Sequence, residues 1–257
     1  MPSAGPPCVV GVLRSSPGDA RPTELAARLG LPEVDEVAAG AVALAFGPHG
    51  LELRSRADKP GSGARLETAW LRHAWRGGVD SLRADPLARA LGARGGEAID
   101  VVDATAGLGA DALLLAALGH RVVAIERSPA LWAVLEDGLA RLADDAILGS
   151  IARRIALRRG DAIDVLATPA VAPDIVYLDP MFPAKRRASA LPPKSAQRLR
   201  VAVGDDPDAA ELLAAARRVA RRRVVVKRPD DAPWLSGEKP SFAIEGRTVR
   251  YDVYVGT

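Results

Sequence analysis

The sequence predicts an α/β protein built on a mostly parallel sheet, with an antiparallel hairpin at the C-terminus and a small α/β extension at the N-terminus. From residue 98 onward, continuous apolar strands alternate with helices, which is the pattern of a parallel sheet covered on both faces. The last two strand-like segments, SFAIEG and TVRYDVYVG, follow each other closely enough to pair as a hairpin. Ligands of such sheets bind beyond the carboxyl ends of the strands.

The first part of the chain carries the signals of the small extension. CVVGVLR is strand-like, and TELAARLG predicts a helix with Thr23 as its N-cap and Gly30 as its stop. AVALAF and LELRSR flank the turn at residues 47–50 and predict a hairpin. The turn-rich segment DKPGSGA then ends the extension.

The expected domains are the extension at 1–64, a helical connector at 65–97 that breaks near Gly77 and Gly78, and a ligand-binding domain at 98–257. In the last of these, strands are expected at 98–105, 121–126, 155–161, 174–180 and 223–229. Helices are expected between them at 110–118, 129–141 and 207–220. This alternation is typical of a Rossmann-like sheet.

Composition narrows the class of protein. Of the 257 residues, 48% are hydrophobic and 26% are charged, and the net charge is +3, which is ordinary for a globular domain and compatible with a nucleic-acid partner. One cysteine and three widely spaced histidines exclude a disulfide framework, and we expect no bound metal. We find neither a long apolar span nor a signal peptide, so we expect a cytoplasmic protein without a membrane partner.

A glycine-rich turn, DATAGLGADA at residues 103–112, follows the first strand of the ligand-binding domain. Gly107 and Gly109 allow a tight turn and a close approach to a ligand, and the next helix offers N–H groups at its start. The spacing also matches a dinucleotide-binding fingerprint, or a turn that binds nothing. Asp103 favours another ligand, because a carboxylate repels a pyrophosphate but suits a cation. S-adenosylmethionine carries a sulfonium and an ammonium group and no phosphate.

Acidic residues also end the next two predicted strands. Glu126 can accept hydrogen bonds from both hydroxyls of a ribose, or it can be an exposed acid that caps the next helix. Asp161 can accept from the amino group of adenine while the N–H of Ala162 pairs with the ring, or it can be a simple helix N-cap. Together with the glycine turn, these residues predict an S-adenosylmethionine site.

The fourth strand ends in Asp179, Pro180, Met181 and Phe182, which resembles the [DN]-P-P-[FYW] signature of methyltransferases that act on amino nitrogens. An aryl amine is a poor nucleophile because its lone pair is delocalised into the ring. The Asp179 carboxylate and the Pro180 carbonyl can accept its two hydrogens and favour attack by the lone pair, with Pro180 fixing the backbone. Phe182 can stack on a base swung out of its helix. A buried strand that simply stops at an Asp-Pro turn is the alternative.

Cationic residues follow two of these strand ends. Two clusters on one rim would suit contacts with RNA phosphates, and a solvated basic surface is the other interpretation. The members are Lys185, Arg186, Arg187, Lys227 and Arg228.

In combination, these motifs resemble the RsmJ family, bacterial small-subunit ribosomal RNA (guanine-N2)-methyltransferases that use S-adenosylmethionine. The matching segments run in the same order over nearly the whole chain: HGLELR, VVDATAGLGAD, IERSP, VYLDPMFPAK, VVVKRPDDAP and YDVYVGT. The resemblance implies a class I, Rossmann-like methyltransferase and a reaction on a guanine N2 of small-subunit rRNA. It also implies cofactor contacts at Ala110, Asp111, Glu126, Arg127, Asp161, Ala162 and Asp179.

The sequence departs from the family pattern in the stretch WRGGVDSLRADPLARALG, which replaces a glycine-rich segment, and at Asp231, where an aromatic residue can occur. Other functions therefore stay open at this point. The alternatives are methylation of an amino nitrogen in DNA adenine or cytosine or in a protein glutamine, a non-catalytic RNA-binding module of ribosome assembly, and a nicotinamide-dependent oxidoreductase. The target nucleotide and the oligomeric state do not follow from the sequence.

Overall fold

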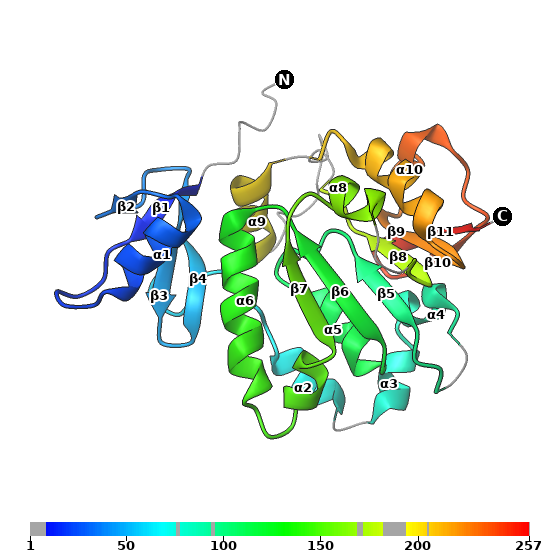
Figure 1. Ribbon diagram of the computed structural model, residues 1–257, viewed down its shortest axis with the longest axis horizontal. Coiled ribbons are helices and arrows are strands. Elements are labelled where there is room, and N and C mark those ends of the chain that lie inside the picture. The colour runs from blue at the N-terminus through cyan, green and yellow to red at the C-terminus, as the bar shows by residue number, and fades with distance from the viewer. Residues whose placement is uncertain are drawn as a thin grey trace. The chain divides into compact units, whose positions relative to one another are not determined.

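The computed structural model describes residues 9–75, 78–93, 96–168, 172–181, 194–204 and 206–256. The chain forms two compact units (Figure 1). The first consists of Met1–Leu66, Ser128–Arg141 and Met181–Asp206, and the second of Glu67–Arg127, Leu142–Pro180 and Pro207–Thr257. Neither unit is continuous in sequence, whereas the domains expected from the sequence were.

The first unit contains a four-stranded sheet in the order β2-β1-β3-β4. β1 pairs in parallel with β2 and β3, and β3 and β4 form the predicted hairpin. The elements of this unit are β1 (Val9–Leu13), α1 (Arg21–Leu29), β2 (Glu33–Val34), β3 (Val42–Gly47), β4 (Gly50–Ser55), most of α6 (Pro129–Ala143) and α9 (Lys194–Val203).

The predicted N-cap of α1 is wrong, while the predicted stop is confirmed. The helix begins at Arg21 after Ala20, because a proline near the start has the φ angle that the first turn requires. Thr23 lies inside the helix, and its hydroxyl donates a hydrogen bond to Glu33 at 3.0 Å. Gly30 ends the helix in the left-handed region, at φ 68°.

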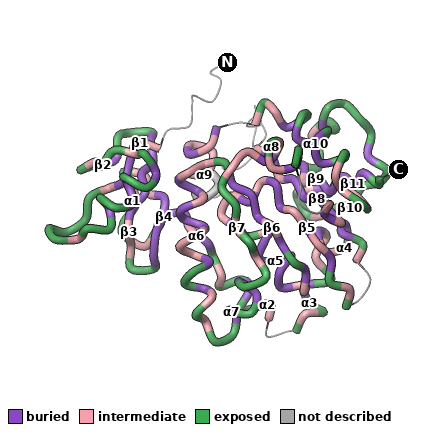
Figure 2. The backbone as a smooth tube through the Cα atoms, in the orientation of Figure 1, coloured by how far each residue is buried: buried purple, intermediate pink, exposed green. Residues whose placement is uncertain are grey.

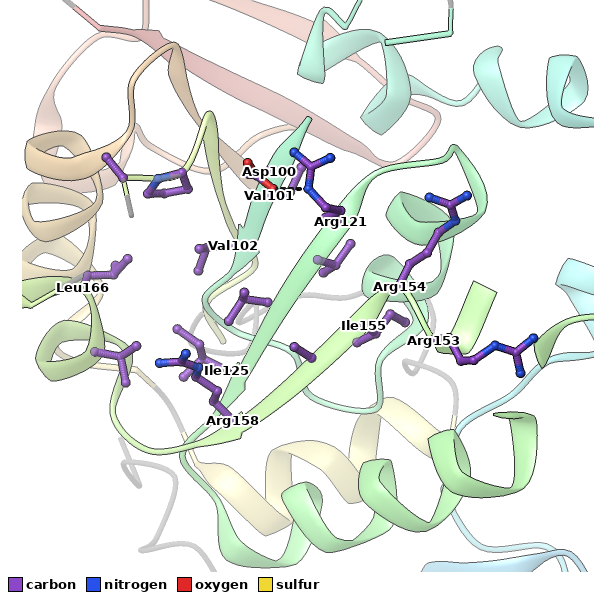
Figure 3. Close-up of a pocket in the computed structure, with 16 residues that line it drawn as sticks. Asp100, Val101, Val102, Arg121, Ile125, Arg153, Arg154, Ile155, Arg158 and Leu166 are labelled. Atoms are coloured by element: carbon purple, nitrogen blue, oxygen red, sulfur yellow. Dashed lines mark hydrogen bonds and ion pairs between the residues drawn. The ribbon is translucent and has the colours of Figure 1, made fainter. Parts of the chain in front are cut away.

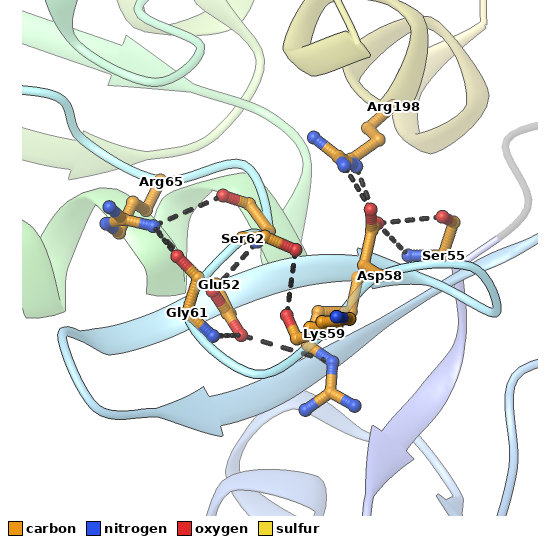
Figure 4. A network of polar contacts seen from close by, with 10 residues as sticks. Glu52, Ser55, Asp58, Lys59, Gly61, Ser62, Arg65 and Arg198 are labelled. Atoms are coloured by element: carbon orange, nitrogen blue, oxygen red, sulfur yellow. Dashed lines mark hydrogen bonds and ion pairs between the residues drawn. The ribbon is translucent and has the colours of Figure 1, made fainter.

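Two carboxylates of the first unit build the turn that follows β4 (Figure 4). Glu52 is 1% exposed and accepts hydrogen bonds from the N–H groups of Gly61 and Gly63, both at 2.9 Å. Asp58 accepts the N–H of Ser55 at 2.8 Å and the Nε of Arg198, on α9, at 2.7 Å. The turn is therefore fixed to its own sheet and to a helix that comes about 140 residues later in the chain.

The second unit is built on a seven-stranded sheet in the order β10-β11-β9-β8-β5-β6-β7. The five strands from β9 to β7 in this order are parallel, and β11 runs antiparallel to β9 and β10, as predicted. The strands are β5 (Asp100–Asp103), β6 (Arg121–Glu126), β7 (Ile155–Arg159), β8 (Ile175–Leu178), β9 (Arg223–Pro229), β10 (Phe242–Glu245) and β11 (Val249–Val255).

Helices connect these strands. Those of the second unit are α2 (Ala69–Trp75), α3 (Val79–Arg83), α4 (Pro86–Leu91), α5 (Ala110–Ala117), α7 (Gly149–Ala152), α8 (Ala162–Ala167), α10 (Ala209–Val219) and the 3₁₀ helix η1 (Leu235–Gly237). The expected break in the connector lies between α2 and α3. Among the described residues, no helix is long and apolar enough to cross a membrane.

The core of the second unit lies at its central strands, where many residues are buried (Figure 2). All four residues of β8 are fully buried, which fits a parallel strand covered on both faces. β5 lies between β8 and β6, although β6 follows it in sequence and β8 comes much later. The strand order therefore reverses at β5, and the carboxyl ends of β5 and β8 are the place where such sheets bind ligands.

Candidate cofactor and acceptor site

The glycine turn lies between β5 and α5 at this switch point. Gly107 and Gly109 both have left-handed backbones, at φ 55° and 81°, which a residue with a Cβ adopts only at a cost. Gly109 is the N-cap of α5, so the helix begins at Ala110. The predicted turn and helix start are therefore present.

Glu126 ends β6 and ties the glycine turn to it. Its side chain is 5% exposed, and its Oε2 accepts the N–H of Gly107 at 2.8 Å. The alternative of an exposed capping acid is therefore wrong. A buried carboxylate that bonds the turn also lies in place to bond a ligand held there.

Asp103 lies at the end of β5 and is 1% exposed. Burial raises the pKa of its carboxyl well above the ordinary value, and the negative charges of Asp111, Asp179 and Glu126 raise it further. The N–H of Thr105 donates to it at 3.2 Å and opposes this rise only in part. The four carboxylates thus form an acidic group that favours a cationic ligand.

Lys227 lies between two members of this acidic group. Its Nζ donates to Asp179 Oδ2 at 2.8 Å and to Asp111 Oδ2 at 3.0 Å. The same oxygen of Asp111 accepts the hydroxyl of Tyr177 at 2.7 Å. The parallel register pairs Leu178 with Val226, so the next residue of each strand brings Asp179 and Lys227 side by side.

The Asp-Pro turn is held from the first strand end as well. The N–H of Asp179 donates to the hydroxyl of Thr105 at 2.6 Å. Asp179 keeps a side chain that is 38% exposed, in contrast to the buried Asp103. The carboxylate is therefore fixed at its base and accessible at its tip, which is what contact with an incoming amine requires.

Asp161 and Arg127 make structural contacts. Asp161 is the N-cap of α8, and its Oδ1 accepts the N–H of Ile163 at 2.8 Å. Ala162 is the first residue of that helix. Arg127 donates from Nη1 to Asp208 at 2.8 Å, which links the end of β6 to the start of α10. The contacts of Asp161, Ala162 and Arg127 with a cofactor stay predictions.

Both predicted RNA-binding cations of β9 make contacts within the protein. Lys227 is engaged by two carboxylates. Arg228 is 3% exposed and donates to the carbonyl of Pro233, and burial lowers the pKa of its guanidinium. The contact of Lys227 and Arg228 with RNA phosphates stays a prediction. The other predicted residues, Phe182, Lys185, Arg186 and Arg187, lie outside the described residues.

Comparison with known proteins decides the family. The family described as putative SAM-dependent methyltransferase matches residues 24–256. The chain belongs to this family. It is 48% identical over 238 residues to the ribosomal RNA small subunit methyltransferase J of Thioalkalivibrio sulfidiphilus, over 91% of this chain and 92% of that one. The protein of the same name from Aeromonas hydrophila is 45% identical over 250 residues, which cover 95% and 97% of the two chains.

A solved structure shows the same fold. The SAM-dependent methyltransferase of Neisseria gonorrhoeae superposes with a TM-score of 0.67 at 29% identity, and the match covers 95% of both chains. The predicted Rossmann-like class I fold is confirmed, and the protein is a methyltransferase that uses S-adenosylmethionine. Its site fits this cofactor, because the buried carboxylate of Asp103 and the acidic group around it suit a sulfonium and an ammonium.

Sequence reasoning missed three residues that lie at the candidate site. Thr105 and Tyr177 bond Asp179 and Asp111, and Tyr251 pairs with Lys227 across β9 and β11. Tyr177 precedes Asp179 by two positions, so the period of a strand places both side chains on one face. That signal was in the sequence, whereas the neighbours of Thr105 and Tyr251 depend on strands far apart in the chain.

A hollow of about 610 Å³ on the open face of β5, β6 and β7 contains none of the predicted site residues (Figure 3). Valines of these strands form its floor, and four arginines lie around it: Arg121, Arg153, Arg154 and Arg158. Three of them already make contacts, with Asp100 and with the carbonyls of Ala143 and Gly119. The hollow therefore shares no lining residue with the candidate site.

Proposed function

We propose that this methyltransferase transfers a methyl group from S-adenosylmethionine to the exocyclic N2 of a guanine in small-subunit ribosomal RNA. The arrangement that carries the proposal is an accessible Asp179 carboxylate, followed by Pro180, at the switch point of the sheet and beside the glycine turn. The relatives support the substrate class, since they are named ribosomal RNA small subunit methyltransferases. A ribosomal RNA substrate supports a cytoplasmic location, because ribosomal subunits are there.

The chain's own groups have defined tasks in this reaction. Bound S-adenosylmethionine would supply the methyl carbon to which the N2 lone pair bonds; the electron pair of the broken S–C bond would stay on sulfur, and the methylated nitrogen would lose one proton to water. Asp179 accepts a hydrogen bond from the amine, and the Pro180 carbonyl accepts the other. Both bonds localise the lone pair on nitrogen, and their fixed geometry contributes most when the nitrogen becomes pyramidal.

The cofactor is assigned to the edge formed by the ends of β5 and β6. Asp103 and Glu126 are the buried carboxylates for its cationic and ribose groups, and Gly107 and Gly109 allow its close approach. Ala110 contributes an N–H at the start of α5. Asp111 is linked to Asp179 through Lys227, so it connects the cofactor edge to the acceptor edge.

Mass spectrometry of ribosomal RNA tests this function. We expect rRNA from a strain that lacks the gene to lose one N2-methylguanosine of the small subunit, and the wild-type gene to restore it. The Asp179→Ala gene is the matched control and should not restore it. An unchanged small-subunit rRNA, with a methyl group missing elsewhere, would reject the substrate and point to another amino nitrogen.

Calorimetry with purified protein tests the cofactor separately. We expect S-adenosylmethionine and S-adenosylhomocysteine to bind, and NAD to bind more weakly than either, because the acidic group around Asp103 repels a pyrophosphate. Tighter binding of NAD would contradict the assignment of this edge.

A further inference from the structure

Lys227 is placed where it can control the residue that receives the target amine. Its Nζ lies 2.8 Å from Asp179 Oδ2 and 3.0 Å from Asp111 Oδ2, and its side chain is 24% exposed. Burial alone would lower the pKa of this ammonium, but the attraction of Asp179 and Asp111 outweighs burial and raises it. Lys227 is therefore a permanent cation that joins two carboxylates.

We propose that Lys227 is a positioning residue, whose ammonium group fixes the orientation and the ionised state of the Asp179 carboxylate for contact with the target amine. The inference rests on the proposed function and replaces the predicted phosphate contact of Lys227. A carboxylate has about four lone-pair sites, so a bond from Lys227 to Oδ2 is compatible with a second bond from an amine. Thr105 fixes the backbone of the same residue, so side chain and backbone are held from different strands.

The charges around this contact explain why a cation is needed. Asp111 and Asp179 bond the same Nζ, so the loss of Lys227 would leave two neighbouring carboxylates without the charge between them. Two carboxylates that lie close enough to bond one ammonium repel each other, so one of them would take up a proton or the two would move apart. Asp103, Tyr177 and Tyr251 also interact with members of this trio, and none of these three side chains can carry a positive charge in place of Lys227.

The test is single-turnover methyl transfer to unmethylated small-subunit rRNA at saturating cofactor and RNA, across a pH series. We expect Lys227→Met to be slower by roughly tenfold to a hundredfold, less than the 10²–10³ typical of a group that touches the reacting atoms. The acid limb of its pH–rate profile should move to higher pH, because the carboxylates take up a proton more readily without the ammonium. Raising the pH should therefore restore part of the rate.

Two variants separate positioning from a general structural role. Lys227→Arg keeps the charge with a different shape, so it should keep the wild-type position of the acid limb even if its rate is lower. Lys239→Met removes an exposed lysine of the same unit and should match the wild type. Circular dichroism and thermal unfolding check that each protein is folded.

Three results would overturn the inference. They are a wild-type rate in Lys227→Met, a slower rate without displacement of the acid limb, and an unchanged rate with weaker RNA binding and a smaller salt dependence. The last result would restore the phosphate role.

Failure of the proposed function is recognised independently, because the wild-type protein would then methylate no small-subunit rRNA. In that case the pH dependence of S-adenosylhomocysteine binding tests whether Lys227 keeps the neighbouring carboxylates ionised. Positioning requires the curve of Lys227→Met to move to higher pH, and coincident curves would reject it.

Discussion

At the scale of single residues, the candidate site at the switch point is a group of ionisable side chains, of which Asp103 and Glu126 are buried. Asp103 could be predicted as a ligand-binding residue from the sequence, because a carboxylate at the end of an apolar strand is seldom needed for the packing of that strand. The place of Lys227 beside Asp179 could not be predicted from the sequence, because it follows from the register of two strands separated by more than 40 residues. The binding partner of a lysine or arginine at a strand end can therefore be predicted only when the pairing of the strands is known.

The raised pKa of Asp103 predicts a pH-dependent affinity for the cofactor. The folded protein without cofactor keeps the Asp103 proton to a higher pH than the unfolded chain, so this group's contribution to stability is present at low pH and is lost as the pH rises through the raised pKa. A cationic ligand prefers the ionised form, so S-adenosylmethionine should bind more tightly as the pH rises through the same range.

Calorimetry over a pH series measures this effect against two variants. Asp103→Asn should bind more weakly and show a flatter pH dependence than the wild type. Asp100→Asn removes a carboxylate from the other end of the same strand, where Arg121 pairs with it, and should behave like the wild type. The same pH dependence in Asp103→Asn and the wild type would assign the titration to another group.

Asp179→Ala should abolish most methyl transfer and leave the fold intact. The carboxylate accepts a bond that strengthens as the amine becomes pyramidal, so its loss should slow the single-turnover rate by about 10²–10³. The Thr105 bond uses the backbone of residue 179 and survives the substitution. Cofactor affinity is measured beside the rate, and a folded variant that transfers methyl at the wild-type rate would reduce the Asp-Pro turn to a strand terminator.

At the scale of elements, local patterns located the strands of the second unit but not the partners of the helices. β6 and β9 have the predicted bounds because apolar β-branched runs bounded by turns are unambiguous. The N-cap at Thr23 failed because Pro22 set the helix start earlier. The apolar pattern of α6 predicted a helix, but nothing local showed that it packs in the first unit.

Gly138 of α6 gives a prediction for this packing. An Ala normally stabilises a helix interior relative to Gly by about 1 kcal/mol. Here an added Cβ would lie 2.7 Å from the Cβ of Leu66, closer than atoms can approach. Gly138→Ala should therefore lower the free energy of unfolding by about 1 kcal/mol, since overpacking typically costs 1–3 kcal/mol.

The exposed Ala140 of the same helix provides the control. Ala140→Gly should cost about 1 kcal/mol through propensity alone. Both values come from urea denaturation with unchanged m-values. A gain in Gly138→Ala equal to the loss in Ala140→Gly would show that no close contact exists at Leu66.

At the scale of the whole molecule, the chain passes repeatedly between its two units. The first unit takes residues 128–141 from between β6 and β7 and residues 181–206 from directly after the Asp-Pro turn. Three contacts hold these segments to the N-terminal residues: Arg28 with Glu136 at 2.7 Å, the N–H of Leu51 with Asp137 at 2.9 Å, and Arg198 with Asp58 at 2.7 Å. We therefore expect that the N-terminal extension does not fold as a separate domain.

This interleaving predicts that a protein starting at residue 65 will fail, although it keeps every described residue assigned to the cofactor or the acceptor. The deletion uncovers the faces of α6 and α9 that pack in the first unit, and we expect it to remove cooperative unfolding and S-adenosylhomocysteine binding.

Asp58→Asn is a milder variant for the case that the truncated chain does not fold at all. It leaves the guanidinium of Arg198, which is 10% exposed, without its charged partner, and breaking such a buried pair costs about 3–5 kcal/mol. Adding Arg198→Met should recover part of that loss, because the stranded charge is removed with it. If the truncated protein unfolds cooperatively near the temperature of the full chain and binds S-adenosylhomocysteine equally well, the extension is an accessory domain after all.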